Sequence, residues 1–174
     1  NKYLSLARAV ESDISIFLHF TKSPVIAVTG SKGKSSTVSA INYGLNKAGY
    51  TSFLGGNITV SPLTFLDKTT EDTPVVLELS SWQLADLRGR KELRPYISLI
   101  TKIVPDHQNW YGNMEDYVAD KRLIYKDQDK GCYTIVDMDA DEPGTGPSSG
   151  GSWGNLFAKE TKGTVLRYTR KNSL

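Results

Sequence analysis

The sequence has few of the residues that would support a disulfide-rich, metal-rich or membrane protein. Its single cysteine, Cys132, lies in an apolar run, which predicts a small core residue rather than a nucleophile. No apolar run approaches the length of a membrane span, and no signal peptide is visible. The net charge of +2 is too small to indicate a nucleic-acid partner. We therefore expect a cytoplasmic globular protein without membrane or nucleic-acid partners.

The composition is otherwise ordinary, with 39% hydrophobic and 23% charged residues, so the chain can bury a core of its own. Alternating strand-like and helix-like segments favour an α/β fold with a mostly parallel sheet and helices on both faces. Strands are expected at 25–28, 51–54, 75–79, 96–101, 132–136 and, more weakly, 164–169, and helices at 34–48 and 114–127. Residues 3–10 suggest a short helix, 14–20 a strand or a short helix, and the Gly-, Pro- and Ser-rich stretch 139–155 a mobile loop.

The most informative segment is 25–36, where a predicted buried strand leads through a glycine-rich turn into a helix. Such a turn presents backbone N–H groups to phosphate oxygens, while a lysine reaches the β- and γ-phosphates and a serine hydroxyl holds Mg²⁺. In this chain the lysine and serine are Lys34 and Ser35. The residues expected to bind the triphosphate of a nucleotide are Thr29, Gly30, Ser31, Lys32, Gly33, Lys34, Ser35 and Ser36.

The spacing of this turn departs from the general phosphate-loop pattern, because the nearest glycine, Gly30, stands three residues before Gly33 rather than five. For the bare motif, a glycine- and serine-rich turn with a solvated lysine is an equally good interpretation. The strand before it favours phosphate binding, as does a following helix with Val38, Ile41 and Leu45 at helical spacing.

Polar residues also follow other predicted strands at their carboxyl ends, where α/β sheets bind ligands. Glu78 closes one strand, Asp106 and His107 come soon after another, and Asn57 follows a third, where a simple turn is the alternative. Carboxylate and imidazole groups can bind Mg²⁺ where phosphate oxygens complete the shell. Each residue alone is more often a cap or a structural group, but their convergence at one sheet edge predicts a site.

Lys121 lies on the apolar stripe of the predicted helix 114–127, together with Tyr117 and Tyr125. One interpretation is a snorkelling lysine with an apolar stem and a hydrated ammonium group, and the spacing alone favours it. The other is a desolvated lysine with a lowered pKa, which could react or be carbamylated by CO₂ to give a metal-binding anion.

Five segments together resemble the Mur ligases, both in sequence and in order. They are 27–37, 55–58, 77–84, 105–107 and 117–121. The phosphate loop of that family has the same shortened spacing, and the Glu-Leu-Ser-Ser-aromatic-Gln-Leu form is similar to its D-glutamate-adding members. The resemblance covers residues 2–136 well and the rest poorly. It implies a P-loop NTPase-like central ATP-binding domain at 22–174, incomplete at its C-terminal end, after a linker or the end of a preceding domain at 1–21.

The resemblance implies an ADP-forming ligase of peptidoglycan synthesis, which adds D-glutamate to UDP-N-acetylmuramoyl-L-alanine through an acyl phosphate. By matching positions, Lys34 stabilises the γ-phosphoryl group during transfer. Ser35 and Glu78 hold one Mg²⁺, and His107 with carbamylated Lys121 holds a second. The residues implied near the sugar-peptide substrate are Asn57, Ser80 and Gln83.

Two departures from the family affect the second metal. Asn109 stands where the family has an acidic residue, and Lys102 replaces an asparagine before the Asp-His segment. A lysine there would repel the metal or replace part of its charge. The uridine-binding and amino-acid-binding domains of the family have no counterpart in the chain, so we expect the chain alone to be inactive in ligation.

We further expect a monomer that acts on small molecules. Two alternatives stay open. One is another ADP-forming ligase of the superfamily, either a different Mur ligase or an enzyme that adds glutamate to folate. The other is a nucleotide-binding module without catalysis.

Overall fold

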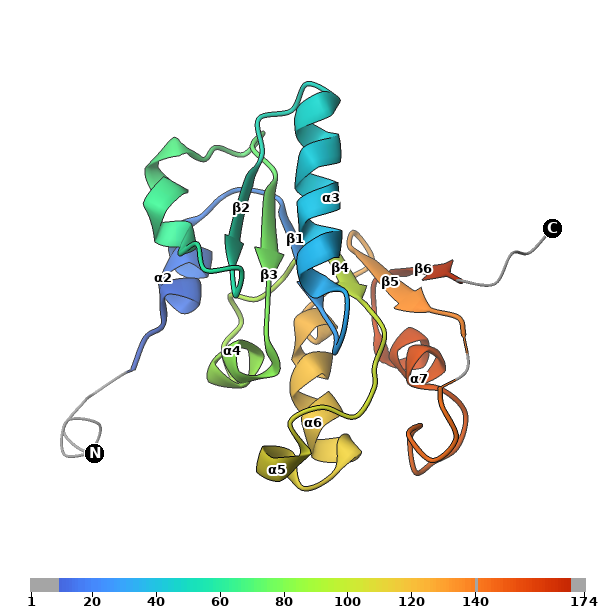
Figure 1. Cartoon of the computed structure of the whole chain (residues 1–174). Coiled ribbons are helices and arrows are strands. Elements are labelled where there is room, and N and C mark those ends of the chain that lie inside the picture. The colour runs from blue at the N-terminus through green and yellow to red at the C-terminus, as the bar shows by residue number, and fades with distance from the viewer. Residues whose placement is uncertain (1–9, 140, 170–174) are drawn as a thin grey trace.

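The part of the chain that the structure describes is built around a six-stranded, fully parallel sheet in the order β2-β3-β1-β4-β5-β6 (Figure 1). The computed structural model describes residues 10–139 and 141–169. The strands are β1 Val25–Thr29, β2 Phe53–Gly56, β3 Val75–Glu78, β4 Ile97–Ile100, β5 Tyr133–Asp137 and β6 Thr164–Tyr168. The predicted strands are confirmed to within one or two residues at either end.

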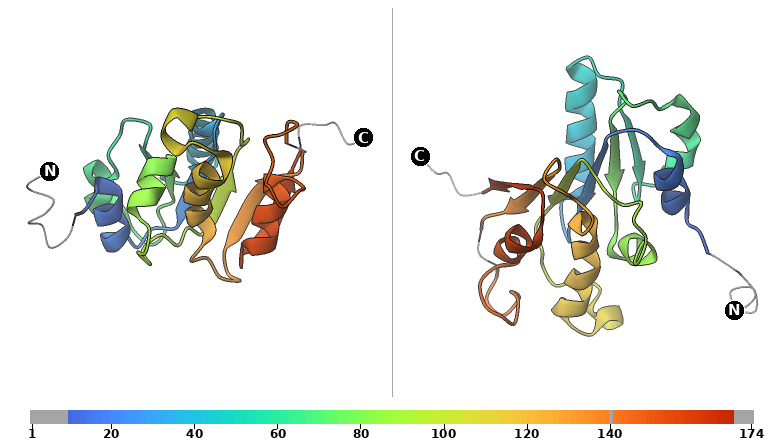
Figure 2. Two further views of the ribbon diagram at one scale, coloured as in Figure 1. Left: turned by 90° about the horizontal axis from the view of Figure 1, so that it is seen from below. Right: turned by 180° about the vertical axis from the view of Figure 1, so that it is seen from behind.

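Helices cover both faces of the sheet, as predicted (Figure 2). They are α2 Asp13–Phe20, α3 Lys34–Lys47, α4 Ser81–Asp86, α5 Gln108–Tyr111, α6 Met114–Lys121 and α7 Trp153–Glu160, with 3-10 helices η1 Pro62–Lys68 and η2 Arg122–Tyr125. Successive residues of a strand point to opposite faces, so Ile26 and Val28 pack with Val38 of α3, while Val25 and Ala27 pack in a larger cluster. That larger cluster includes side chains of α2, α4, α6 and α7.

The carboxyl end of β1 lies where the strand order reverses. The chain leaves β1 for β2 and β3 on one side of it, and then crosses to β4, β5 and β6 on the other. Val28 pairs with Glu78 at the end of β3, and Thr29 with Ile100 at the end of β4. The turn after β1 therefore opens between two strand ends, which is where sheets of this kind bind ligands.

The segment 14–20, for which a strand and a short helix were both open, is the helix α2. Its side chains Ile14 and Phe17 are fully buried, and the Phe17 ring packs edge-on against Phe65 of η1. The N-terminal part of the chain therefore contributes to the core from Ile14 onward. The domain boundary at residue 22 stays a prediction. Most of the helix expected at 3–10 lies outside the described residues.

The helix predicted at 114–127 is wrong beyond Lys121, where α6 tightens into the 3-10 turn η2. No glycine or proline marks this point in the sequence. The tightening accompanies tertiary contacts, because Arg122 and the Tyr125 hydroxyl both donate hydrogen bonds to Glu160 of α7. Within the described residues no helix combines the length and the apolar character needed to cross a bilayer.

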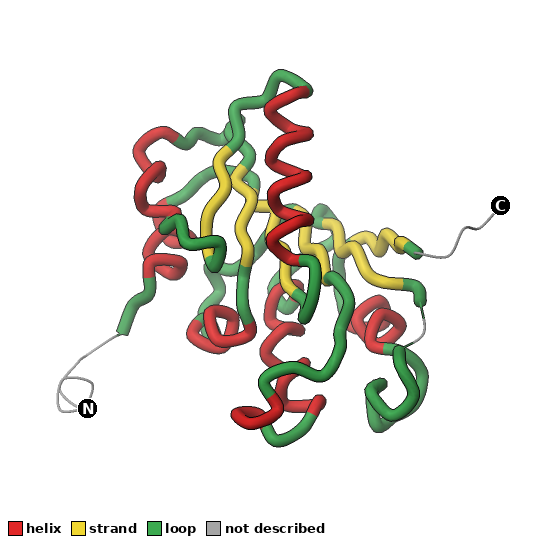
Figure 3. Tube along the Cα trace, viewed as in Figure 1, coloured by secondary structure: helices red, strands yellow, loops and turns green. Residues whose placement is uncertain are grey.

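The loop predicted at 139–155 is shorter than expected, because α7 begins at Trp153 (Figure 3). The Trp153 side chain is 1% exposed, its indole N–H donates to the Thr145 carbonyl at 2.7 Å, and its backbone N–H donates to Asp141. Ser152 caps the helix. Sequence reasoning missed α7 because the Gly- and Ser-rich composition hid a Ser cap followed by Trp, Leu and Phe at helical spacing.

Candidate active site

The turn after β1 is shaped by two glycines with left-handed backbone. Gly30 has a φ of 137°, and a Cβ there would overlap the Thr101 hydroxyl at the end of β4. Gly33 has a φ of 89° and is the N-cap of α3. The first N–H groups of a helix have no partner within it, so the start of α3 offers donors and the positive end of the helix dipole to an anion.

Part of the turn is already tied to its neighbour. The backbone N–H groups of Ser31 and Lys32 donate to the Lys102 carbonyl at 3.0 and 3.4 Å. These two groups are therefore engaged with the segment after β4, although sequence reasoning expected the whole turn to wrap phosphate. The first turn of α3, from Lys34 and the exposed Ser35, remains as the surface that faces a ligand.

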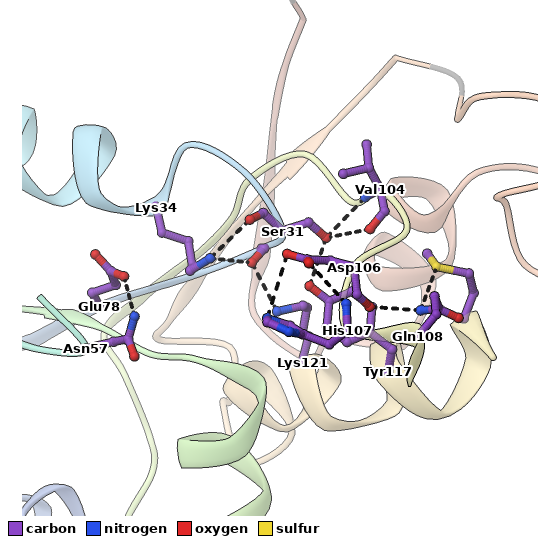
Figure 4. A network of polar contacts seen from close by, with 12 residues as sticks. Ser31, Lys34, Asn57, Glu78, Val104, Asp106, His107, Gln108, Tyr117 and Lys121 are labelled. Atoms are coloured by element: carbon purple, nitrogen blue, oxygen red, sulfur yellow. Dashed lines mark hydrogen bonds and ion pairs between the residues drawn. The ribbon is translucent and has the colours of Figure 1, made fainter. Parts of the chain in front are cut away.

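Two lysines converge on one carbonyl oxygen of this turn (Figure 4). The ammonium groups of Lys34 and Lys121 each donate to the Gly30 carbonyl at 3.0 Å, and Lys34 also donates to that of Ser31 at 3.1 Å. Lys121 is 2% exposed, and its ammonium lies 4.5 Å from the centre of the Tyr117 ring. Burial, with the nearby Lys34 charge, lowers the pKa of Lys121 to about 7. The desolvated interpretation of Lys121 therefore replaces the snorkelling one.

On the other side of Lys34, Glu78 presents a buried carboxylate (Figure 4). Glu78 is 2% exposed; its Oε1 accepts a 2.8 Å hydrogen bond from the Asn57 amide, and its Oε2 is buried with no hydrogen-bond partner among the described residues. An unpaired buried carboxylate oxygen is costly unless a cation completes it. Asn57 therefore orients the Glu78 carboxylate in this structure. The unpaired oxygen Oε2 is the kind of ligand atom that Mg²⁺ prefers.

His107 lies beyond Lys121 at the start of α5, with its backbone in the left-handed region at φ 52°. Its backbone N–H donates to Asp106 Oδ1 at 3.0 Å, and its half-exposed imidazole lies 3.7 Å from Asp106 Oδ2. The Trp82 ring packs against the imidazole at 4.5 Å between centroids. These contacts hold the ring at the mouth of the site, on the same side as Lys121 (Figure 4).

The two other predicted substrate residues, Ser80 and Gln83, form the capping box of α4. The Ser80 hydroxyl accepts from the Gln83 backbone N–H at 3.2 Å, and Gln83 Oε1 accepts from the Ser80 N–H at 3.0 Å. Lys102, expected near the second metal, instead has its ammonium 4.0 Å from Asp137 of β5.

The structure also places three residues around the turn that sequence reasoning did not identify: Thr101, Tyr117 and Val104. Thr101 packs on Gly30, and the Tyr117 hydroxyl donates a hydrogen bond to the Ser31 hydroxyl. The Ser31 hydroxyl also donates to the Val104 carbonyl and accepts from the Val104 N–H. The only sequence signal was the hydroxyl of Tyr117 on an otherwise apolar stripe. Backbone partners such as Val104 leave no signal in side-chain identity.

No group of three or more His, Cys, Asp or Glu side chains among the described residues is arranged to hold a metal ion. The predicted ligands are of mixed type: one carboxylate, one imidazole, the Ser35 hydroxyl and Lys121 after carbamylation. Such a set needs phosphate oxygens to complete it, so it fits a metal that arrives with a nucleotide rather than a permanent metal centre. The unpaired oxygen of Glu78 is the observation in favour of the first ion.

The sequence signature of the Mur ligase middle domain matches residues 28–145. The UDP-N-acetylmuramoylalanine–D-glutamate ligase of Treponema pallidum is 48% identical over 181 aligned residues, which cover 96% of this chain and 32% of that protein. The enzyme of the same name from Borreliella afzelii is 50% identical over 79% of this chain and 30% of its own length. The chain thus spans about a third of the length of the curated relatives it matches.

Solved structures show the same fold at low identity. MurF from Acinetobacter baumannii has a TM-score of 0.64 and 17% identity, covering 89% of this chain and 33% of that one. MurF from Thermotoga maritima, solved in complex with ADP, has a TM-score of 0.61 and 18% identity, covering 94% and 38%. Signature, relatives and fold agree: this chain belongs to the Mur ligase family, of which it carries the middle domain.

Proposed function

We propose that this chain is the ATP-binding domain of an ADP-forming ligase that adds D-glutamate to UDP-N-acetylmuramoyl-L-alanine in peptidoglycan precursor synthesis. The observation that carries the proposal is the pair of lysines on one glycine carbonyl, beside a buried carboxylate with an unpaired oxygen. The names of the relatives at 48–50% identity supply the substrate. Because the proposed substrates are ATP and other small molecules, we propose that the reaction takes place in the cytoplasm and that the protein acts as a monomer.

Lys34 binds the β- and γ-phosphates in this proposal. Its ammonium now donates to two neutral carbonyls of its own turn. An ionised phosphate oxygen adds a charge–charge attraction to the hydrogen bond that a neutral carbonyl lacks, so an incoming phosphate displaces these contacts. During transfer the same ammonium stabilises the γ-phosphoryl group and the negative charge that develops on the departing ADP.

Ser35 and Glu78 would hold the first Mg²⁺. Ser35 is exposed in the first turn of α3, and Glu78 ends the neighbouring strand. An ion held by these two residues would neutralise phosphate charge, which lowers the repulsion between the γ-phosphate and the substrate carboxylate. Asn57 keeps the Glu78 carboxylate oriented through its amide hydrogen bond.

Lys121, once carbamylated, and His107 would hold the second Mg²⁺. With a pKa of about 7, much of Lys121 is the free amine at neutral pH. The amine lone pair can form a bond to the carbon of CO₂, and loss of one proton from nitrogen leaves an anionic carbamate. This changes a buried cation into an oxygen ligand for a metal beside the imidazole of His107.

A chimera tests the activity directly. This chain would replace the aligned segment of the Treponema pallidum ligase, and ADP release would be measured with D-glutamate and with other amino acids. We expect D-glutamate-dependent turnover that Lys34→Ala abolishes. A chimera that folds and binds ADP without ligating any amino acid would instead favour a non-catalytic module, and preference for another amino acid would favour a different ligase.

A further inference from the structure

Two buried hydroxyl groups meet at the centre of the site. The Tyr117 hydroxyl on α6 donates at 3.0 Å to the Ser31 hydroxyl in the turn after β1, residues 30–33, which we call the phosphate turn (Figure 4). Both residues are buried, and they are 86 positions apart in the sequence. The contact therefore joins the turn to a helix on the opposite face of the sheet from α3.

The Ser31 hydroxyl has no hydrogen-bonding capacity left for a nucleotide. It donates to the Val104 carbonyl at 2.9 Å and accepts from the Val104 N–H at 3.1 Å and from Tyr117. A serine hydroxyl has one donor and two acceptor positions, and all three are used. The Ser31 side chain therefore holds the turn in place, although the motif suggested that it binds the nucleotide.

Tyr117 also contacts the two predicted ligands of the second metal. Its ring centre lies 4.5 Å from the Lys121 ammonium and 6.2 Å from the His107 ring centre. Val104, the third partner, precedes Asp106 and His107 by only two and three residues. One side chain thus touches the phosphate turn, Lys121 and His107, and it is bonded through Ser31 to the backbone that leads to His107.

We propose that Tyr117 is a positioning residue, which with Ser31 and Val104 forms a clasp that fixes the phosphate turn relative to His107 and Lys121. The proposal rests on the proposed function only in taking the turn as the nucleotide site. The clasp preorganises the turn, so its hydrogen bonds do not have to be ordered when the nucleotide binds.

Tyr117→Phe removes one hydroxyl and keeps the ring, and Tyr111→Phe is the matched control. The Tyr111 hydroxyl donates to Asp120 at 2.9 Å, and its ring lies 5.3 Å from that of Tyr117. The dissociation constant of ADP with Mg²⁺ would be measured by calorimetry for the 174-residue chain. We expect Tyr117→Phe to raise it about three- to tenfold, the effect of one hydrogen bond, with no change for Tyr111→Phe.

Two further measurements separate positioning from general stability. Hydrogen exchange of the Ser31 and Lys32 amides in the ligand-free chain should accelerate in Tyr117→Phe, while amides of β1 and β3 keep their protection. Ser31→Ala should lower the affinity for ADP by a similar factor. The double variant should bind ADP no less tightly than the single variant with the lower affinity, because both substitutions remove the same contact.

Equal ADP affinity in Tyr117→Phe and the unaltered chain would overturn the clasp, as would an equal loss in Tyr111→Phe. Additive losses in the double variant would overturn it too. Failure of the unaltered chain to bind ADP would instead count against the proposed function, so the two ideas fail separately.

Discussion

At the residue scale, several charged groups of this site lie in surroundings that do not stabilise the ligand-free protein. Lys121 is a buried amine whose pKa falls to about 7, and Glu78 is a buried carboxylate with one unpaired oxygen. Lys34 and Lys121, both cations in ordinary surroundings, share one carbonyl. Residues held in unfavourable electrostatic surroundings are typical of functional sites, where the missing charges come with the ligand.

Glu78→Gln separates the effect of this buried carboxylate on folding stability from its proposed role in binding Mg²⁺. The amide keeps an oxygen to accept from Asn57 but removes the unpaired charge, so without metal we expect the free energy of unfolding to stay unchanged or to rise by about 1 kcal/mol. The same variant should lose the enhancement of ADP affinity by Mg²⁺. Urea unfolding in EDTA and calorimetry with and without Mg²⁺ measure the two effects.

Glu92→Gln is the control, because Glu92 also has a buried oxygen without a hydrogen-bond partner but lies outside the site. It should leave the Mg²⁺ effect intact. Marked destabilisation of Glu78→Gln in EDTA would mean that the carboxylate has a structural role, and a preserved Mg²⁺ effect would remove Glu78 from the metal site.

The lowered pKa of Lys121 predicts a dependence of stability on pH. Between about pH 7 and the ordinary lysine value of 10.5, the unfolded chain holds a proton on Lys121 that the folded chain has lost. Stability therefore rises with pH across this window, by up to about 1.4 kcal/mol per pH unit. The buried amine destabilises the fold most below pH 7, where both states are protonated, and this cost disappears above the ordinary lysine pKa. Lys121→Met should flatten this slope in CO₂-depleted buffer, as followed by urea unfolding from pH 7 to 9.5.

Lys126→Met serves as the comparison, because Lys126 is an exposed lysine five residues further along. Its slope should match that of the unaltered chain. If Lys121→Met also kept the full slope, the amine of Lys121 would be charged in the folded protein and carbamylation at neutral pH would lose its basis.

At the scale of elements, the close approach of helices to the sheet decides which glycines are required. Gly154 in α7 lies against β5, and a Cβ there would overlap the Asp137 carbonyl. Gly44 in α3 has nothing within 4 Å of the same position. Both are helical glycines, but only the first is a site of backbone contact.

Alanine at these two glycines should therefore have opposite effects. Gly44→Ala should stabilise the chain by about 1 kcal/mol, since alanine loses less backbone entropy in an exposed helix. Gly154→Ala should destabilise it by about 1–3 kcal/mol, because α7 must move away from β5. Urea unfolding measures both. Equal effects of the two changes would contradict the packing of α7 described above.

The sequence predicted the sheet better than its helices, and for physical reasons. Nearly continuous apolar runs such as 75–79 are a strong local signal for buried parallel strands. Short helices such as α4 and α5 carry too few turns for periodicity to show, and the end of α6 depends on Glu160, which is distant in sequence. In the candidate site, residue type and spacing pointed to Glu78 and Lys121. The contacts of Ser31 gave no such signal, because two of its three hydrogen bonds are to the Val104 backbone.

At the scale of the whole molecule, the strand order brings the residues of the site together. β1 carries the phosphate turn between β3, which ends in Glu78, and β4, which leads to His107. Lys121 reaches the same turn from α6 on the face opposite α3. Segments from residue 30 to residue 121 thus meet at one point, so ligand binding there should stabilise the whole fold rather than one loop.

ADP with Mg²⁺ should therefore raise the free energy of unfolding of the complete chain, by about 2.7 kcal/mol when free ADP is 100 times its dissociation constant. Lys34→Ala should lose most of this gain, because we propose that its ammonium binds the phosphates. Lys47→Ala, at the other end of the same helix and exposed, should keep it. Thermal unfolding at a series of ADP concentrations measures the effect. A ligand that binds only the folded state must raise the unfolding midpoint as its occupancy rises. A midpoint that does not move with ADP in the unaltered chain, or that moves equally in Lys34→Ala, would therefore contradict nucleotide binding at Lys34.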